Sequence, residues 1–264
     1  MSGLYTEVSG SGPALALLHG WGLNLRVWDG LAAALCDRFR VIAVDLPGHG
    51  RSDWLAERSS LAAQAQQVHE AVSAIAGTYS LLGWSLGGQI ALRLAAAPPG
   101  STAAAIDRLV LIAATPCFSA GPDWPHGAPP QRLAEQAAAL RTDYRRTVAD
   151  FLELQVRGSA AGEETLKQLR AALFSHGEAR PQALARGLEL LRDTDLRPLL
   201  GGIATPALVI AGQYDRVTLP AASRALAEQL TDARYVEIRR AAHAPFLSHL
   251  PQVSALLAEF LRQP

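Results

Sequence analysis

Short runs of apolar residues recur along the chain, and each is followed by a loop and then by a longer segment with helical spacing. Six runs have the length and composition of buried strands: 14–18, 41–44, 80–82, 109–112, 207–210 and 235–238. Segments such as 31–35, 61–75 and 90–97 carry apolar residues at three- and four-residue intervals, which predicts helices. Strands that are apolar throughout are typical of parallel sheets with helices on both faces. The pattern predicts a doubly wound, mostly parallel α/β sheet.

This alternation stops after residue 112. Five prolines punctuate the next segment, namely Pro116, Pro122, Pro125, Pro129 and Pro130, and no strand-like run follows until residue 207. Four amphipathic helices are predicted in between: 131–140, 143–156, 163–173 and 181–191. Open α/β sheets bind ligands at the carboxyl ends of their strands, so a helical block between two strands indicates a cap over that edge. We expect a core of residues 1–115 and 199–264 and an inserted helical cap of residues 116–198.

Ser85 lies in Gly83-Trp84-Ser85-Leu86-Gly87, directly between a predicted strand and a predicted helix. This is the G-x-S-x-G pattern of a nucleophile elbow, in which the serine occupies a strained turn that presents its hydroxyl above the sheet. The flanking glycines leave room for the backbone that crosses the turn. We expect an exposed, strained serine aimed at a substrate. The alternative is a glycine-rich turn that only packs a helix against a strand.

A serine hydroxyl is a weak nucleophile near neutral pH, so it needs a base within reach and an acid that orients the base. In this fold class the chain order is serine, acid, histidine. Asp215 follows the predicted strand 207–210, and His243 follows the predicted strand 235–238. Both would emerge at the same edge of the sheet as Ser85. We predict that these three residues form a catalytic triad.

Other acids and histidines compete for these roles. His249 lies near the last predicted helix, and Asp193 and Asp195 fall within the cap, where a loop carboxylate is usually just solvated. His69 and His176 lie on predicted helices, and we interpret them as ordinary surface or packing residues.

Acyl transfer also needs donors for the oxyanion that forms when a carbonyl is attacked. We predict that one is the backbone N–H of Leu86, at the start of a helix. The other is predicted to be the N–H of Trp21, in the glycine-containing loop His19-Gly20-Trp21-Gly22 after strand 14–18. The alternative is that this loop is a turn without a donor role. In the loop 45–52, the glycines and the proline are interpreted as shaping the loop itself rather than as catalytic.

Composition limits the classes of partner. Lys+Arg 24 balances Asp+Glu 24, so the overall charge favours neither nucleic acid nor an anionic membrane. Cys36 and Cys117 are far apart, which indicates neither a disulfide framework nor a metal site and fits a reducing compartment. The first residues lack the features of a signal peptide, and no apolar run is long enough to span a bilayer. We expect a cytoplasmic monomer that uses no metal or organic cofactor.

Together these motifs resemble the α/β-hydrolase superfamily. Within it, the chain resembles the pimeloyl-acyl carrier protein methyl ester esterase family of biotin synthesis, over both core and cap. The discriminating stretches are Pro116-Cys117-Phe118-Ser119-Ala120 and Phe151-Leu152-Glu153-Leu154-Gln155, supported by 17–24, 83–88, 187–191 and 241–246.

The resemblance implies an esterase that removes a methyl group from an acyl chain carried on acyl carrier protein. It makes Ser85 the nucleophile, His243 the general base and acid, and Asp215 the residue that orients His243. The implied substrate-binding residues are Trp21, Ser85, Leu86, Phe151, Leu152, Glu153, Leu154, Gln155 and His243. The alternatives are a general short-chain carboxylesterase, a carbon–carbon bond hydrolase of the same fold, or a non-catalytic ligand-binding member.

An acidic carrier protein would dock on positive charge on the cap. The implied docking residues are Arg146, Arg157, Lys167 and Arg170. Here the chain departs from the family pattern, because Asp150, Glu163 and Glu164 interrupt this charge. We therefore expect a weaker docking surface or a shifted one.

Overall fold

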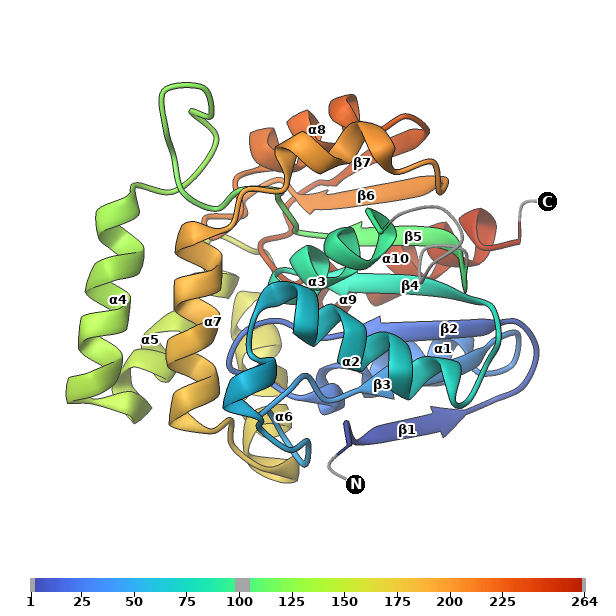
Figure 1. The fold of residues 1–264 in the computed structure, drawn as a ribbon, viewed down its shortest axis with the longest axis horizontal. Coiled ribbons are helices and arrows are strands. Elements are labelled where there is room, and N and C mark those ends of the chain that lie inside the picture. The colour runs from blue at the N-terminus through green and yellow to red at the C-terminus, as the bar shows by residue number, and fades with distance from the viewer. Residues whose placement is uncertain (1–2, 98–104, 263–264) are drawn as a thin grey trace.

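The computed structural model describes residues 3–97 and 105–262 of the 264-residue chain (Figure 1). Within this part the strands form one sheet of order β1-β3-β2-β4-β5-β6-β7. The strands are β1 (Thr6–Ser9), β2 (Ala14–Leu18), β3 (Arg40–Val44), β4 (Tyr79–Trp84), β5 (Ile106–Ile112), β6 (Ala207–Gly212) and β7 (Ala233–Ile238). All neighbouring pairs are parallel except β1 with β3. The predicted mostly parallel sheet is confirmed.

The edge strand β1 is the strand that the apolar pattern did not predict. Its sequence is Thr-Glu-Val-Ser, and its residues are half-buried or exposed. It pairs antiparallel with β3, with Thr6 opposite Val44. An edge strand with little buried side-chain surface needs no apolar run, so its formation depends on pairing with a neighbour that is remote in sequence.

Helices cover both faces of the sheet (Figure 1). One face carries α2 (Leu61–Ser73), α3 (Leu86–Ala95) and α8 (Pro220–Gln229), and the other carries α1 (Asp29–Leu35), α9 (Pro245–Ser248) and α10 (Leu250–Phe260). Short 3₁₀ helices are η1 (Leu25–Trp28), η2 (Ala56–Arg58) and η4 (Arg197–Gly202). The central strands are therefore buried on both sides, as their apolar sequences require.

The helical insertion between β5 and β6 is also confirmed. It consists of α4 (Pro130–Thr142), α5 (Tyr144–Val156), α6 (Gly162–His176) and α7 (Pro181–Asp193). Proline is the first residue of α4 and α7, and the Asp143 side chain caps α5 by accepting from the amide of Arg146 at 3.0 Å. Figure 1 shows these helices at the left, beyond the carboxyl ends of the parallel strands. The insertion therefore covers the edge where Ser85 emerges.

In the described part of the chain, no helix combines the length and the apolar content that crossing a bilayer requires.

Candidate active site

Ser85 joins β4 to α3 in a strained backbone conformation. Its φ is 56° and its ψ is −116°, which is unusual for a residue with a Cβ. The turn is held because the Ser85 amide donates to the carbonyl of Ile112 at 3.1 Å, and the amide of Gly88 donates to the Ser85 carbonyl at 2.9 Å. Strain of this kind, on the order of 1–3 kcal/mol, persists where the surrounding structure enforces it. The predicted elbow is present.

The glycines on either side of Ser85 are required by close backbone contacts. A Cβ at Gly83 would overlap the carbonyl of Gly87, and a Cβ at Gly87 would overlap the carbonyl of Leu18. The strand-to-helix turn is therefore too tight for any side chain at these two positions.

Asp215 and His243 lie together, at the ends of β6 and β7. Nδ1 of His243 donates to Oδ2 of Asp215 at 2.8 Å, and both side chains are buried. The other carboxylate oxygen accepts from the amides of Val217 at 2.8 Å and Thr218 at 3.0 Å. These bonds fix the carboxylate, and the carboxylate in turn fixes the ring orientation of His243 and leaves its Nε2 free to act as a base.

Core and cap both hold the backbone of His243. Its carbonyl accepts from Nε1 of Trp84, the residue before Ser85, at 2.8 Å. Its amide donates to the carbonyl of Gln155, near the end of α5, at 2.9 Å. The rings of Trp84 and His243 lie 5.5 Å apart between centroids. His243 is thus beside the elbow, and its position depends on the cap.

The competing residues lie elsewhere. Nδ1 of His249 pairs with the hydroxyl of Ser248 at 2.9 Å and not with an acid. Asp193 and Asp195 are ion-paired on the surface with Arg192 and Arg197, each at 2.6 Å. The structure brings together the predicted acid and histidine and leaves the alternatives apart.

The loop that carries Trp21 is supported by two buried histidines. Nε2 of His19 accepts from the amide of Leu46 at 2.9 Å, and its Nδ1 donates to the carbonyl of Gly20 at 2.8 Å. His49, from the loop 45–52, accepts from the amide of Gly22 at 3.3 Å. Burial lowers the pKa of His49 to about 4 and holds the pKa of His19 well below its usual value. Both rings are neutral at pH 7, as acceptors of amide N–H groups must be. Through His49, the loop 45–52 supports the Trp21 loop, a contact that the sequence did not predict.

The Trp21 side chain is clamped by the cap. Its Nε1 donates to the carbonyl of Leu184 in α7 at 2.9 Å, and its ring meets Phe151 of α5 edge to face at 5.1 Å. A Cβ at Gly187 would lie 2.6 Å from Cδ1 of Trp21 and 3.6 Å from the Leu86 side chain. Helix α7 therefore packs directly onto the two residues predicted to donate to an oxyanion. Leu86 begins α3, so its N–H has no acceptor within that helix.

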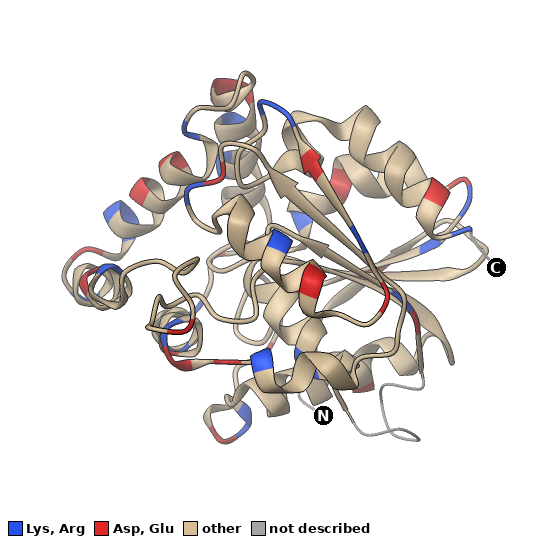
Figure 2. Cartoon of the chain, turned by 90° about the horizontal axis from the view of Figure 1, so that it is seen from above, with Lys and Arg blue, Asp and Glu red and all other residues tan. Residues whose placement is uncertain are grey.

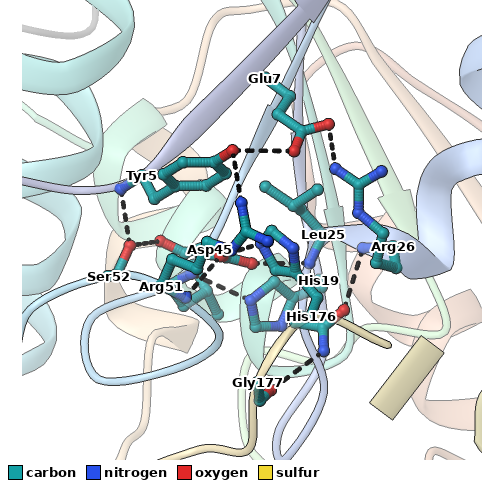
Figure 3. A network of polar contacts seen from close by, with 12 residues as sticks. Tyr5, Glu7, His19, Leu25, Arg26, Asp45, Arg51, Ser52, His176 and Gly177 are labelled. Atoms are coloured by element: carbon teal, nitrogen blue, oxygen red, sulfur yellow. Dashed lines mark hydrogen bonds and ion pairs between the residues drawn. The ribbon is translucent and has the colours of Figure 1, made fainter. Parts of the chain in front are cut away.

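A second buried polar cluster fastens the cap to the core (Figure 3). Oδ2 of Asp45, just after β3, accepts from Nε2 of His176, the last residue of α6, at 2.9 Å. The same carboxylate accepts from the amides of Leu25 at 2.8 Å and Arg51 at 2.9 Å. The Asn24 side chain donates to the carbonyls of Ala172 and Gly177 at 2.9 and 3.2 Å. We call Asn24, Asp45 and His176 the cap anchor.

The sequence reasoning did not single out the cap anchor. It classed His176 as an ordinary surface or packing residue, whereas the structure gives it a specific buried partner. The available signal was that Asp45 directly follows a buried strand, where a carboxylate needs hydrogen-bond partners.

The five residues 151–155 do not share one environment. Leu152 and Gln155 are buried, Phe151 and Leu154 are half-buried, and Glu153 is exposed. Glu153 bonds Arg170 of α6 at 3.1 Å on the outer surface. A helix turns 100° per residue, so five consecutive side chains cannot all line one pocket. Glu153 therefore lies on the exposed side of α5, away from the buried Leu152 and Gln155, and its part in substrate binding stays a prediction.

The site is closed. Ser85 is 2% exposed and His243 is 1% exposed. The expectation of an exposed serine was therefore wrong, because α5 and α7 cover the elbow.

The residues implied in carrier docking are exposed residues of the cap. The cap carries positive and negative residues close together (Figure 2). Arg146 lies 3.7 Å from Asp150, and Arg170 pairs with Glu153. Arg157 and Lys167 are exposed, and within the described residues neither is in an ion pair.

Comparison with known proteins agrees with this geometry. Residues 13–250 match the family model described as alpha/beta hydrolase fold. A pimeloyl-[acyl-carrier protein] methyl ester esterase of Nitrosomonas europaea is 39% identical over 94% of this chain and 95% of its own. Proteins of the same name from Stenotrophomonas maltophilia and Xanthomonas oryzae are 40% and 41% identical, each over 98% of this chain and over 96% and 98% of their own.

Solved structures show the same fold. An esterase from Exiguobacterium antarcticum superposes with a TM-score of 0.89 at 23% identity, covering 98% of this chain and 96% of that one. A hydrolase from Pseudomonas aeruginosa superposes with a TM-score of 0.80 at 30% identity, covering 98% and 94%. The chain therefore belongs to the α/β-hydrolase fold family and, within it, to the family of pimeloyl-[acyl-carrier protein] methyl ester esterases.

Proposed function

We propose that the protein hydrolyses the methyl ester of a pimeloyl chain borne on acyl carrier protein, releasing methanol and the free carboxylate. The observation that carries the proposal is the buried pair of Asp215 and His243, bonded at 2.8 Å beside the strained Ser85. Family membership supports the choice of substrate.

In this proposal, Oγ of Ser85 attacks the ester carbonyl while Nε2 of His243 takes its proton. The carbonyl oxygen becomes an oxyanion that accepts from the N–H groups of Leu86 and Trp21. His243 then gives the proton to the departing methoxy oxygen, so methanol leaves and an acyl-enzyme remains. Water attacks the acyl-enzyme with His243 again as base, and the carboxylic acid is released as Ser85 regains its proton.

Phe151, Leu152, Leu154 and Gln155 of α5 are proposed to contact the acyl chain. Phe151 packs on Trp21, and the Gln155 carbonyl holds the His243 amide, so this face of α5 adjoins the catalytic residues. Both polar atoms of the Gln155 side chain are buried and have no partner among the described residues. Its amide is available to bond the polar ester end of a substrate.

The test is hydrolysis of methyl pimeloyl-acyl carrier protein, followed by methanol release and by the mass of the carrier. Wild-type protein should produce the free acid, and Ser85→Ala should abolish turnover while the circular dichroism spectrum is retained. Expression should also restore growth without biotin to a strain that lacks this esterase. Hydrolysis of short nitrophenyl esters without turnover of the carrier-borne ester would instead identify a general esterase.

A further inference from the structure

We propose that the acidic face of the carrier protein docks on a cluster of arginines at the seam between core and cap, beside the loops that carry Asp215 and His243. This inference rests on the proposed function, because the carrier is part of the proposed substrate. The cluster, called here the seam arginines, comprises Arg132, Arg157, Arg216, Arg239 and Arg240.

Hydrogen bonds link the parts of the chain that carry these residues, namely α4, the loop between α5 and α6, the loop after β6 and the loop after β7. Nη1 of Arg132, in α4, donates to the carbonyl of Arg216 at 3.3 Å. The amide of Ala160, in the loop between α5 and α6, donates to the carbonyl of Arg240 at 3.2 Å. The amide of Arg240 donates to Oε1 of Gln213 at 3.0 Å, which joins the loop after β7 to the loop after β6.

A further contact places Arg157 in the same group. Gly158, the next residue, lies against Tyr214, because a Cβ added at Gly158 would be 3.5 Å from the Tyr214 Cβ. Tyr214 is 43% exposed and lies two residues before Arg216. The seam thus combines positive charge with an exposed aromatic side chain, a residue type enriched at protein interfaces.

The charge of the seam arginines is not neutralised locally. Arg157, Arg216, Arg239 and Arg240 are exposed, and Arg132 is partly exposed. None of the five forms an ion pair within the described residues. The segments 131–134, 157–161, 213–217 and 238–241 contain one acidic residue, Asp215, which is buried and bonded to His243. Arginine stays protonated at any physiological pH, so the patch is permanently positive.

The outer cap surface is less suited to an acidic partner. Arg146 and Arg170 are engaged with Asp150 and Glu153. Lys167 shares a surface hollow of about 650 Å³ with Glu163 and Glu164. These carboxylates would repel an acidic helix, so the favourable positive surface lies at the seam.

The position of the seam suits delivery of an acyl chain. Arg216 follows Asp215 directly, and Arg240 precedes His243 by three residues. Because these loops carry Asp215 and His243, a carrier docked at the seam lies close to the buried catalytic residues. Complementary charge at that point raises the rate of productive encounter and excludes neutral or basic proteins.

The experiment compares two methyl esters of pimelate, one on acyl carrier protein and one free in solution. The test variant is Arg157→Glu/Arg239→Glu, and the matched control is Arg141→Glu, on the exposed end of α4. In low salt we expect the test variant to lose at least about tenfold in kcat/KM on the carrier-borne ester. The free ester should be hydrolysed within about twofold of wild type by both variants. Carrier protein without its acyl arm should inhibit wild type competitively and the test variant much less.

Docking at the seam would be overturned if the test variant and the control lost kcat/KM on the carrier-borne ester equally, or if the test variant lost none. Either result would leave the proposed function intact. Wild-type protein that cleaves the free ester but never the carrier-borne one would overturn the proposed function, and docking with it. If Arg157→Glu/Arg239→Glu also reduces hydrolysis of the free ester, the neutral variants Arg157→Gln and Arg239→Gln are tested in its place. The conservative variants Arg157→Lys and Arg239→Lys should retain activity on the carrier-borne ester, because they keep the positive charge.

Discussion

Nε2 of His176 in the cap lies 2.9 Å from Oδ2 of Asp45 in the core, and both side chains are buried. The Asp45 carboxylate also accepts from the amides of Leu25 and Arg51, so one group ties together η1, the loop 45–52 and the end of α6. The loop 45–52 in turn supports the Trp21 loop through His49. Attachment of the cap and support of the candidate oxyanion loop therefore share one buried carboxylate.

Replacement of His176 should destabilise the protein. His176→Leu leaves the buried Asp45 carboxylate with one hydrogen bond fewer, and we expect the free energy of unfolding to fall by about 1–3 kcal/mol. Urea unfolding monitored by tryptophan fluorescence measures the change. His249→Leu is the control, since within the described residues the His249 side chain bonds only the neighbouring Ser248, and the change in stability should be less than about 1 kcal/mol. Similar losses in the two variants would argue against the cap anchor.

A methyl group at Gly187 should disturb the site through Trp21. Alanine favours a helix over glycine by about 1 kcal/mol, so Gly187→Ala would be stabilising if local preference decided the outcome. Instead the new Cβ would lie 2.6 Å from the Trp21 ring, which is held by its bond to Leu184. We expect a fall in kcat of roughly tenfold or more and a loss of about 1–3 kcal/mol in stability. Gly121→Ala, where a Cβ meets no atom within 4 Å, is the control. A more stable and fully active Gly187→Ala would refute this packing argument.

Gln155 should show opposite effects on stability and on substrate binding. Its buried amide has no partner in the described residues, and an unsatisfied amide costs about 1–3 kcal/mol. We expect Gln155→Met to stabilise the fold by about 1 kcal/mol, because it removes the unsatisfied amide. We also expect KM for the methyl ester to rise about tenfold, because the substrate loses one hydrogen bond. Unfolding curves and steady-state kinetics on the same preparation test both signs. An unchanged KM would exclude the Gln155 side chain from substrate binding.

Acid should destabilise the protein through His49. The pKa of His49 is about 4 in the folded state, below the value of 6.5 in an unfolded chain. The unfolded state therefore binds this proton first, and stability present above pH 6.5 is lost as the pH falls toward 4. The contribution is up to about 3 kcal/mol. Urea unfolding at several pH values should give a shallower dependence for His49→Gln than for wild type; identical slopes would show that His49 is not held neutral.

The cap shows how far local patterns reach. The four amphipathic segments predicted between residues 131 and 191 are α4 to α7, because helix periodicity and capping are properties of neighbouring residues. The same periodicity places Glu153 on the exposed side of α5, apart from the buried Leu152 and Gln155, although the motif resemblance grouped residues 151–155 together. A motif marks a stretch of sequence, whereas the helix decides which of its side chains face inward.

By itself, the sequence determined six of the seven strands, the helical insertion and the turn at Ser85, since apolar runs and tight glycine turns are encoded in adjacent residues. It also supplied the order in which Asp215 and His243 follow. Only the tertiary structure decided that these two side chains meet, that the cap closes over them, and that Asp45 binds His176 across 131 residues of chain. Such contacts depend on which distant segments the fold brings together. The hydrogen-bond partner of a buried polar group can therefore be identified only when that packing is known.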